Sequence, residues 1–245
     1  MLSNKVITTF GELTCLVQEF RRDGAWVFRG VRESTYELVP KIGRPEARKL
    51  KGTGENLPYD RVAEETLTLH FIRSAAPYVS HVPRTRLEWL ALAQHHGMFT
   101  RLLDWSESLL VAAYFAVEDA RNLKSNPVIY CIRDVPTACD ILHDEIEKLD
   151  DVVLYYPPHI SPRIPAQSAL FTVHKRPNVP FRPQNMFTIE IAESPLTIKL
   201  DLNACGIHKE SLFPDINGLA EHQSWLYKWG EHKLITRPAS NGSER

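Results

Sequence analysis

The stretch that decides the fold runs from Trp89 to Asp119 and reads WLALAQHHGMFTRLLDWSESLLVAAYFAVED. Thr85 and Glu88, just before it, form a T-x-x-E capping box, and the apolar residues that follow keep helical spacing. Gly97 stands where a helix-ending residue with positive φ is expected. The first part of the stretch therefore predicts a helix that ends with two histidines in its last turn.

The second part of the stretch predicts another helix, with Ser106 as its N-cap. Its apolar and small residues cover every side, so the helix should be buried. Residues 100–105 then form an extended link between two packed helices. The polar side chains of this link should therefore either point into a cavity or be buried at a high cost in free energy.

Composition excludes several classes of protein. The chain has 245 residues, of which 43% are hydrophobic, enough for one large domain or a domain with an appendage. A formal net charge of −1 gives no overall attraction to nucleic acid or membranes. No apolar run is long enough for a signal peptide or a membrane span. The four cysteines are scattered without a C-x-x-C pair, which favours a reducing, cytosolic compartment without disulfides or a metal site.

The remaining patterns predict helices early and strands late, an α+β arrangement. A Thr9–Glu12 capping box opens a helix that Asp23-Gly24 ends, and Asp60 caps a helix from Arg61 to about Ala76. Residues 31–59 are loop-like, and their basic part, 41–51, is either a solvated loop or a mobile flap that contacts phosphate. The other expected segments are strands at 25–30, 127–132, 152–155, 168–174, 186–191 and 196–202, and an acidic helix at 137–149.

Motifs spread over residues 25–220 carry a resemblance to a known family. They are Trp26 with Phe28-Arg29-Gly30; Trp89 with Gln94-His95-His96-Gly97; Thr100 to Ser106; Ala112 to Ala116; Pro158, Arg163 and Gln167 ahead of Phe171; and Ser211 to Asp215 with Gly218-Leu219. By these motifs the chain is identified as a member of the FRG-domain family, which is named for the triplet seen here at 28–30. The expected organisation is an N-terminal helix at 1–24, the FRG domain at 25–220, and a C-terminal helix and tail at 221–245.

A second resemblance concerns chemistry. Val27-Phe28-Arg29-Gly30 is similar to the first strand motif of ADP-ribosyltransferases of the arginine–serine–glutamate class. Asp104-Trp105-Ser106, followed by residues 111–116, resembles the second motif, and Ala166-Gln167-Ser168-Ala169 precedes a strand as the third motif does. The chain departs from that class where Asp104 replaces the first serine and where the catalytic glutamate is missing. The resemblance implies a single domain in which a mixed sheet, split by helices, surrounds a central cleft.

The resemblance also implies a site for NAD as substrate. Splitting the nicotinamide–ribose bond develops positive charge that a carboxylate stabilises, and pyrophosphate suits the fork of an arginine. The expected catalytic residues are Asp104, Gln167 and Arg101, with no metal. The expected cofactor-binding residues are Phe28, Arg29, Gly30, His95, His96, Thr100, Trp105 and Ser106.

Each of these residues also has a structural alternative. Arg29 or Arg101 could simply pair with Asp104, since arginine favours buried ion pairs as well as phosphates. One histidine could cap backbone carbonyls, Trp105 could be core, and Gln167 could bond to backbone.

Two functions therefore stay open from the sequence. One is an NAD-using ADP-ribosyltransferase-like enzyme that modifies a protein or nucleic acid, with a bacterial toxin or antiphage role implied by resemblance. The other is a non-catalytic module that binds a nucleotide or partner in the same cleft. A third hypothesis is a protein that binds or modifies nucleic acid through the basic 41–51 loop.

Overall fold

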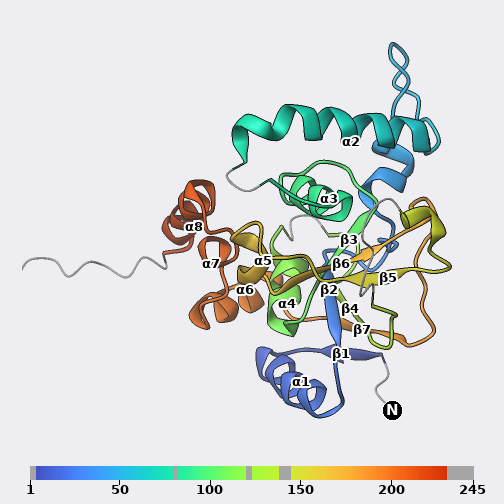
Figure 1. Ribbon diagram of the computed structural model, residues 1–245. Coiled ribbons are helices and arrows are strands. Elements are labelled where there is room, and N and C mark those ends of the chain that lie inside the picture. The colour runs from blue at the N-terminus through green and yellow to red at the C-terminus, as the bar shows by residue number, and fades with distance from the viewer. Residues whose placement is uncertain (1–3, 80–81, 120–122, 138–144, 231–245) are drawn as a thin grey trace, which may run out of the picture.

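The computed structural model describes residues 4–79, 82–119, 123–137 and 145–230 (Figure 1). Within them the chain forms a mixed α+β fold, as expected. The strands are β1 (Lys5–Ile7), β2 (Val27–Val31), β3 (Leu102–Ser106), β4 (Val128–Ile132), β5 (Val153–Tyr155), β6 (Ala169–Val173) and β7 (Met186–Ile191). The α-helices are α1 (Phe10–Arg22), α2 (Arg61–Ala75), α3 (Arg86–His95), α4 (Leu109–Val117), α5 (Arg163–Ala166), α6 (Pro195–Ala204), α7 (Lys209–Leu212) and α8 (Ile216–Trp229). Short 3-10 turns lie at Lys41–Gly43, Pro45–Ala47, Ala76–Tyr78 and Glu145–Lys148.

The seven strands form one open sheet in the order β1-β7-β4-β2-β3-β6-β5. β1 runs parallel to β7, and the other neighbours are antiparallel. The central strands β2 and β3 pair only where Phe28 faces Ser106, whereas β2 and β4 pair over five residues. The sheet is therefore continuous, but it is weakest between β2 and β3, where the expected cleft lies.

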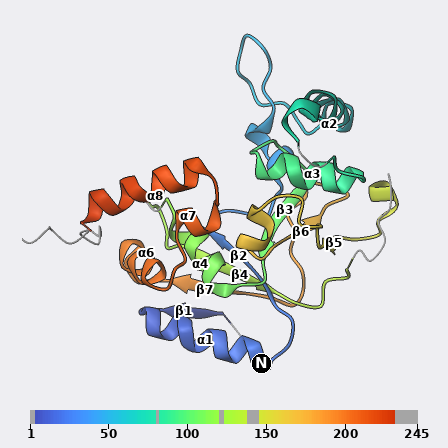
Figure 2. The same cartoon turned by 60° about the vertical axis from the view of Figure 1, so that its left-hand side comes forward.

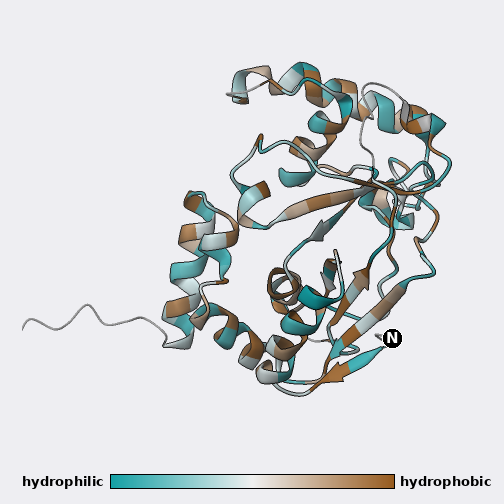
Figure 3. Cartoon of the chain, turned by 60° about the horizontal axis from the view of Figure 1, so that its bottom comes forward, coloured by the Kyte–Doolittle hydropathy of each residue, from teal (hydrophilic) through white to brown (hydrophobic). Residues whose placement is uncertain are grey.

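Helices cover both parts of the sheet. In Figures 1 and 2, α1 lies beside β1 and β7, α2 and α3 lie at the opposite end, and α6, α7 and α8 gather at one side. The helix α4 packs directly on β2 and, with α1 and α6, encloses the largest apolar cluster. A separate cluster joins α3 to β3 and β6. Hydrophobic residues run along the strands, as Figure 3 shows.

Local capping signals in the sequence predicted several helix ends correctly. The Thr9–Glu12 capping box is formed in full, Asp60 accepts hydrogen bonds from two amides at the start of α2, and Thr85 accepts from the Glu88 amide at the start of α3. Gly97 has a φ of +87°, so it follows α3 in the left-handed conformation that glycine adopts at no cost.

Three expectations about the elements were wrong. The N-cap of α4 is Ser108 rather than Ser106, which lies inside β3. Residues 196–202 are part of the helix α6, because Pro195 fits the first helical position and the buried pair Ile198 and Leu202 also has helical spacing. The order is not helices early and strands late, since α6, α7 and α8 end the described chain.

The N-terminal segment is not a separate appendage, since β1 precedes α1 and joins the sheet. The helix α8 begins at Ile216, before the expected boundary at 221. Most of the helix expected at 137–149 lies outside the described residues. Among the described residues, no helix is both long and apolar enough to cross a membrane. Cys15, Cys131 and Cys205 are free thiols, and Cys139 lies outside the described part.

Candidate functional site

A cavity of about 350 Å³ opens where β2 and β3 diverge. Arg29 from β2, Asp104 from β3 and Gln167 from the end of α5 all line it. The expectation that these three residues share one cleft is therefore confirmed. Four aromatic residues also line the cavity, the buried Phe28 and Trp105 and the partly exposed Phe115 and Phe213.

Asp104 is held from two sides. Nη1 of Arg29 donates to the Asp104 backbone carbonyl at 2.5 Å and lies 3.5 Å from Oδ2 of its carboxylate. Nε2 of Gln94 donates to the same Oδ2 at 3.0 Å. The Asp104 side chain nevertheless remains 47% exposed, whereas that of Arg29 is 16% exposed. The carboxylate is thus positioned by neighbours and still accessible from the cavity.

Opposing effects act on the pKa of Arg29. Removal from water lowers its pKa, and the nearby Asp104 carboxylate raises it again, while Arg44 adds a smaller lowering effect. Its shortest hydrogen bond crosses the gap between β2 and β3 to a main-chain oxygen. Arg29 therefore links the two strands where their own ladder ends, in addition to facing the cavity.

His95 presents a neutral imidazole to the cavity. Burial lowers its pKa to about 4, with Asp104 opposing and Arg163 reinforcing the shift. Its Nδ1 is buried and has no hydrogen-bond partner within the described residues. Nη1 of Arg163 donates to the His95 backbone carbonyl at 2.7 Å, which fixes the end of α3. An unpartnered buried nitrogen in a cavity wall is a group that a bound ligand could satisfy.

Trp105 is buried, and a chain of hydrogen bonds fixes its ring. Nε1 donates to Oγ1 of Thr172 at 3.0 Å, and that hydroxyl lies 2.9 Å from Nε2 of His174. Because the Thr172 oxygen already accepts from Trp105, its own hydrogen is left to donate to His174. This arrangement suits a neutral His174, whose pKa burial lowers to about 3, with Arg29 and Arg101 adding to the effect.

Acidification should therefore destabilise the fold through His174 and His95. Both have folded-state pKa values below the ordinary 6.5, so the unfolded chain binds more protons below that pH. The free energy of unfolding should fall as pH drops from 6.5 towards 4, and His174→Gln should reduce this slope by about 1.4 kcal/mol per pH unit. Urea unfolding between about pH 7.5 and about pH 5 measures it. The control His70→Gln, at an exposed position on α2, should keep the original slope; an unchanged slope in His174→Gln would contradict the argument.

Ser106 and Gln167 are joined by a hydrogen bond in the cavity wall. The Ser106 hydroxyl donates to the Gln167 backbone carbonyl at 2.7 Å and accepts from the Ser108 amide. Nε2 of Gln167 donates to the Leu212 carbonyl at 2.9 Å, so this amide also ties α5 to α7. Ser168, with a φ of +45°, turns the chain from α5 into β6 and so places Gln167 at the wall.

Three residues expected in the site lie outside the cavity lining. The Arg101 side chain is 1% exposed and forms a bidentate ion pair with Glu64 of α2, in which both N–O distances are 2.8 Å. Arg101 therefore pairs with Glu64 instead of Asp104, and it does not reach the cavity in which it was expected to be catalytic. Thr100 is fully buried and donates to Oε1 of Gln94 at 2.7 Å, which orients the amide that holds Asp104. His96 is exposed at the end of α3 and faces a different groove.

Phe28 and Gly30 line the cavity, but both also have packing roles. Phe28 is buried and its ring packs edge-on against Phe20 of α1. A Cβ on Gly30 would lie 1.9 Å from the carbonyl oxygen of Ala112, so only glycine lets α4 approach β2 this closely.

Several lining residues had no predicted role. Gln94 lies in the QHHG motif, and its position beside Asp104 could only come from the packing of α3 on β3. Lys41 belongs to the basic 41–51 segment, whose alternative as a ligand-contacting loop fits its place in the lining. Arg163 pairs with Asp215 at 2.5 Å, which places Phe213 against the cavity. Residues 213–215 of the Ser211–Asp215 motif thus connect the C-terminal helices to the cavity wall.

Comparison with known protein families matches residues 24–125 to the FRG domain. No curated protein and no solved structure matches the chain. The matched residues include β2, α3, β3 and α4, the elements that place Arg29, Gln94 and Asp104. The extension of this domain to residue 220 stays a prediction. Residues 24–125 therefore match an FRG domain, and the two strands that border the cavity, β2 and β3, both lie within the matched residues.

Proposed function

We propose that the cavity binds the nicotinamide–ribose half of NAD and that the protein transfers ADP-ribose to a macromolecule, or to water as a glycohydrolase. One observation carries the proposal: a half-exposed carboxylate, Asp104, held by Arg29 and Gln94 at the wall of an aromatic cavity. A toxin or antiphage role rests on the resemblance alone.

In the proposed reaction the main task of the protein is to place a negative charge beside the ribose. The bond between C1′ of the ribose and the nicotinamide nitrogen breaks, and its electron pair leaves with nicotinamide. The positive charge left on the ribose is stabilised by the Asp104 carboxylate, which is a fixed anion in a partly water-excluded site. An acceptor oxygen or nitrogen then bonds to C1′ and loses its proton to solvent.

The lining suits the rest of the ligand. The cavity volume of about 350 Å³ is near the lower end for ligand pockets and fits half a dinucleotide. Phe115 and Phe213 offer aromatic surface for the nicotinamide ring, and the unpartnered nitrogen of His95 offers a polar contact. Lys41 and Arg163 supply positive charge for the pyrophosphate.

The alternative, a non-catalytic module that binds a nucleotide in this cavity, is favoured by the state of Gln167. This residue stands where the resemblance expects a catalytic group, yet its amide is bonded to the Leu212 backbone. In that alternative, the same cavity binds NAD without cleaving it.

A ligand-binding experiment tests the cavity. NAD at about 100 times its Kd should stabilise the folded protein by about 2.7 kcal/mol, measured as a rise in Tm, because it binds only the folded state. Arg29→Ala should remove most of this rise, since it deletes the cavity's most buried cation. Arg32→Ala is the matched control: Arg32 lies just past β2, is exposed and is absent from the lining, so the rise should persist.

Release of nicotinamide separates the two functions. The enzyme proposal expects free nicotinamide when purified protein, acceptor-containing lysate and NAD are combined. A Tm rise without release, even with lysate, would support the binding module. If millimolar NAD gives neither a rise in Tm nor release of nicotinamide, both the enzyme and the binding-module proposals are wrong.

A further inference from the structure

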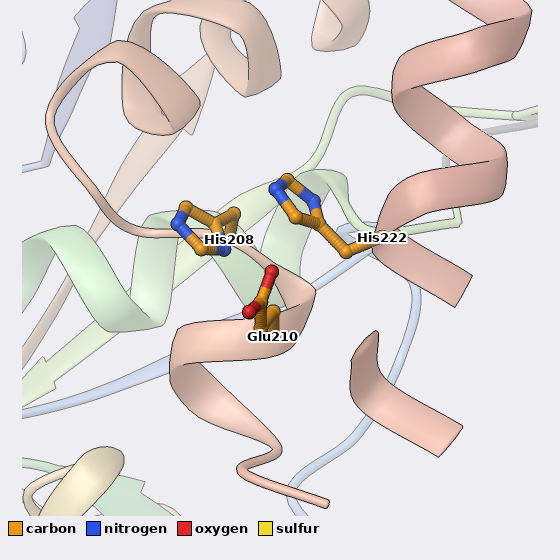
Figure 4. Close-up of side chains that lie close together, drawn as sticks. All are labelled: His208, Glu210 and His222. Carbon is orange, nitrogen blue, oxygen red and sulfur yellow. The ribbon is translucent and has the colours of Figure 1, made fainter. Parts of the chain in front are cut away.

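A second group of potential ligands lies among the C-terminal helices, away from the cavity. His208, just before α7, Glu210 in α7 and His222 in α8 bring one donor atom each within 4.8 Å of the others. Figure 4 shows the Glu210 carboxylate pointing towards the two imidazole rings from below. The rings are stacked, with centroids 4.0 Å apart and planes inclined by 6°. We propose that these three side chains bind a divalent transition metal, with Zn²⁺ as the best fit.

The ring of His222 lines a groove between the C-terminal helices and is not held by a hydrogen bond from any residue that the structure describes. It is 5% exposed, and within the described residues its ring contacts His208 and Trp225 but forms no hydrogen bond. Histidine buried in this way normally donates or accepts at one or both ring nitrogens. Glu210 likewise has neither a hydrogen bond nor an ion pair to the described part of the chain, although Lys209, next to it, is bound by Glu118 and Glu221. Two of the three donors are thus available.

Both histidines lie where burial lowers the pKa of an imidazole. Burial lowers the pKa of His222, and His208 and Lys199 lower it further while Glu210 opposes them. Burial also lowers the pKa of His208, again against Glu210. The proposal itself rests on the spacing of the three donor atoms.

The donor set matches a known type of zinc site. Two imidazole nitrogens and one carboxylate oxygen leave a fourth tetrahedral position for water. Donor atoms on one Zn²⁺ lie about 3.4 Å apart, so the side chains must close in by rotation from the present spacing. Nδ1 of His208 accepts a long hydrogen bond of 3.3 Å from the Ser211 amide; a metal bound through Nδ1 would replace it, and one bound through Nε2 would leave it.

Such a metal would join α7 to α8. Both helices border the segment 213–215, which contributes Phe213 to the cavity wall and Asp215 to the ion pair with Arg163. A cross-link between them would stabilise that wall. This inference does not depend on NAD chemistry, because the donors lie outside the cavity lining.

Zinc binding by the full chain, without a histidine tag and after treatment with a chelator, tests the proposal. Isothermal titration should give one Zn²⁺ per chain, and Tm should rise with Zn²⁺. Glu210→Gln should weaken binding by about 100-fold or more, at the top of the range for altered metal surroundings. Co²⁺ in place of Zn²⁺ should give the visible absorption of a tetrahedral site.

Two variants keep the test decisive. Glu221→Gln removes the same charge from a neighbouring, exposed residue and should retain wild-type affinity. His222→Gln should lose binding, and if it fails to fold, Glu210→Gln decides alone because that side chain forms no hydrogen bond or ion pair with the described residues. Absence of binding by the wild type at micromolar Zn²⁺, or equal affinity of Glu210→Gln and wild type, would overturn the proposal.

Discussion

Asp104→Asn should lower the rate of NAD cleavage by about 10²–10³-fold while leaving the protein folded, because it removes only the charge that would stabilise the cationic ribose. The hydrogen bonds around Asp104 survive the change. The 2.5 Å bond from Arg29 goes to the backbone carbonyl, and the oxygen of an asparagine amide can accept from Gln94 as Oδ2 does now. The pair with Arg29 is long, at 3.5 Å, and the carboxylate is half exposed. The loss of stability should therefore be below about 1 kcal/mol, as for surface ion pairs.

Turnover and unfolding must be measured on the same preparation. Glu107→Gln is the matched control, since it removes a carboxylate from an exposed position close to β3 that does not line the cavity. It should leave both quantities unchanged. If Asp104→Asn instead unfolds easily and keeps its specific activity, Asp104 is structural and plays no part in the reaction. A loss of rate without a loss of NAD affinity would place its effect in the transition state.

Gly30→Ala should destabilise the protein by more than about 3 kcal/mol, beyond the usual cost of an extra methyl group in a packed core. The added Cβ would lie 1.9 Å from the Ala112 oxygen and 2.6 Å from the Ala116 nitrogen. Both are backbone atoms of α4, so no side-chain rotation relieves the clash and the whole helix must move. Urea unfolding of the purified variant, or its absence from the soluble fraction, measures the effect.

The control for this change is Gly11→Ala in α1. There the nearest atom to the new Cβ is Oγ1 of Thr9 at 3.7 Å, an ordinary contact. Stability should stay the same or increase by up to about 1 kcal/mol, because alanine favours a helix more than glycine does. Wild-type stability of Gly30→Ala would show that α4 can shift from β2 freely, and the close packing argument would then be wrong.

Elements whose signals are local could be predicted from the sequence. Caps at Thr9, Asp60 and Thr85 act through hydrogen bonds to amides two or three residues away, so the neighbouring residues alone define them. The segment 196–202 shows where this fails. Its apolar residues alternate as in a strand, yet Ile198 and Leu202 also lie four apart, and Pro195 together with packing on α4 selects the helix.

The residues of the candidate site could be predicted only in part, because some of their partners are distant in the sequence. Arg29 and Asp104 lie in the middle of the neighbouring strands β2 and β3, Gln167 lies at the end of α5, and the packing of these elements brings all three to one cavity. Arg101 has a similar sequence context to Asp104 but pairs with Glu64, 37 residues away. No local pattern specifies which distant carboxylate an arginine meets.

The sequence by itself determined the α+β class, several helix ends, the match of residues 24–125 to the FRG domain, and the three residues that share the cavity. Only the tertiary structure decided which charges are paired and which are available. Arg101 is neutralised inside the protein, whereas Asp104 stays half exposed, and His222 lies against His208 beside Glu210. The physical reason is that electrostatic partners are set by distance and burial in space, and these depend on how helices pack on the sheet rather than on spacing along the chain.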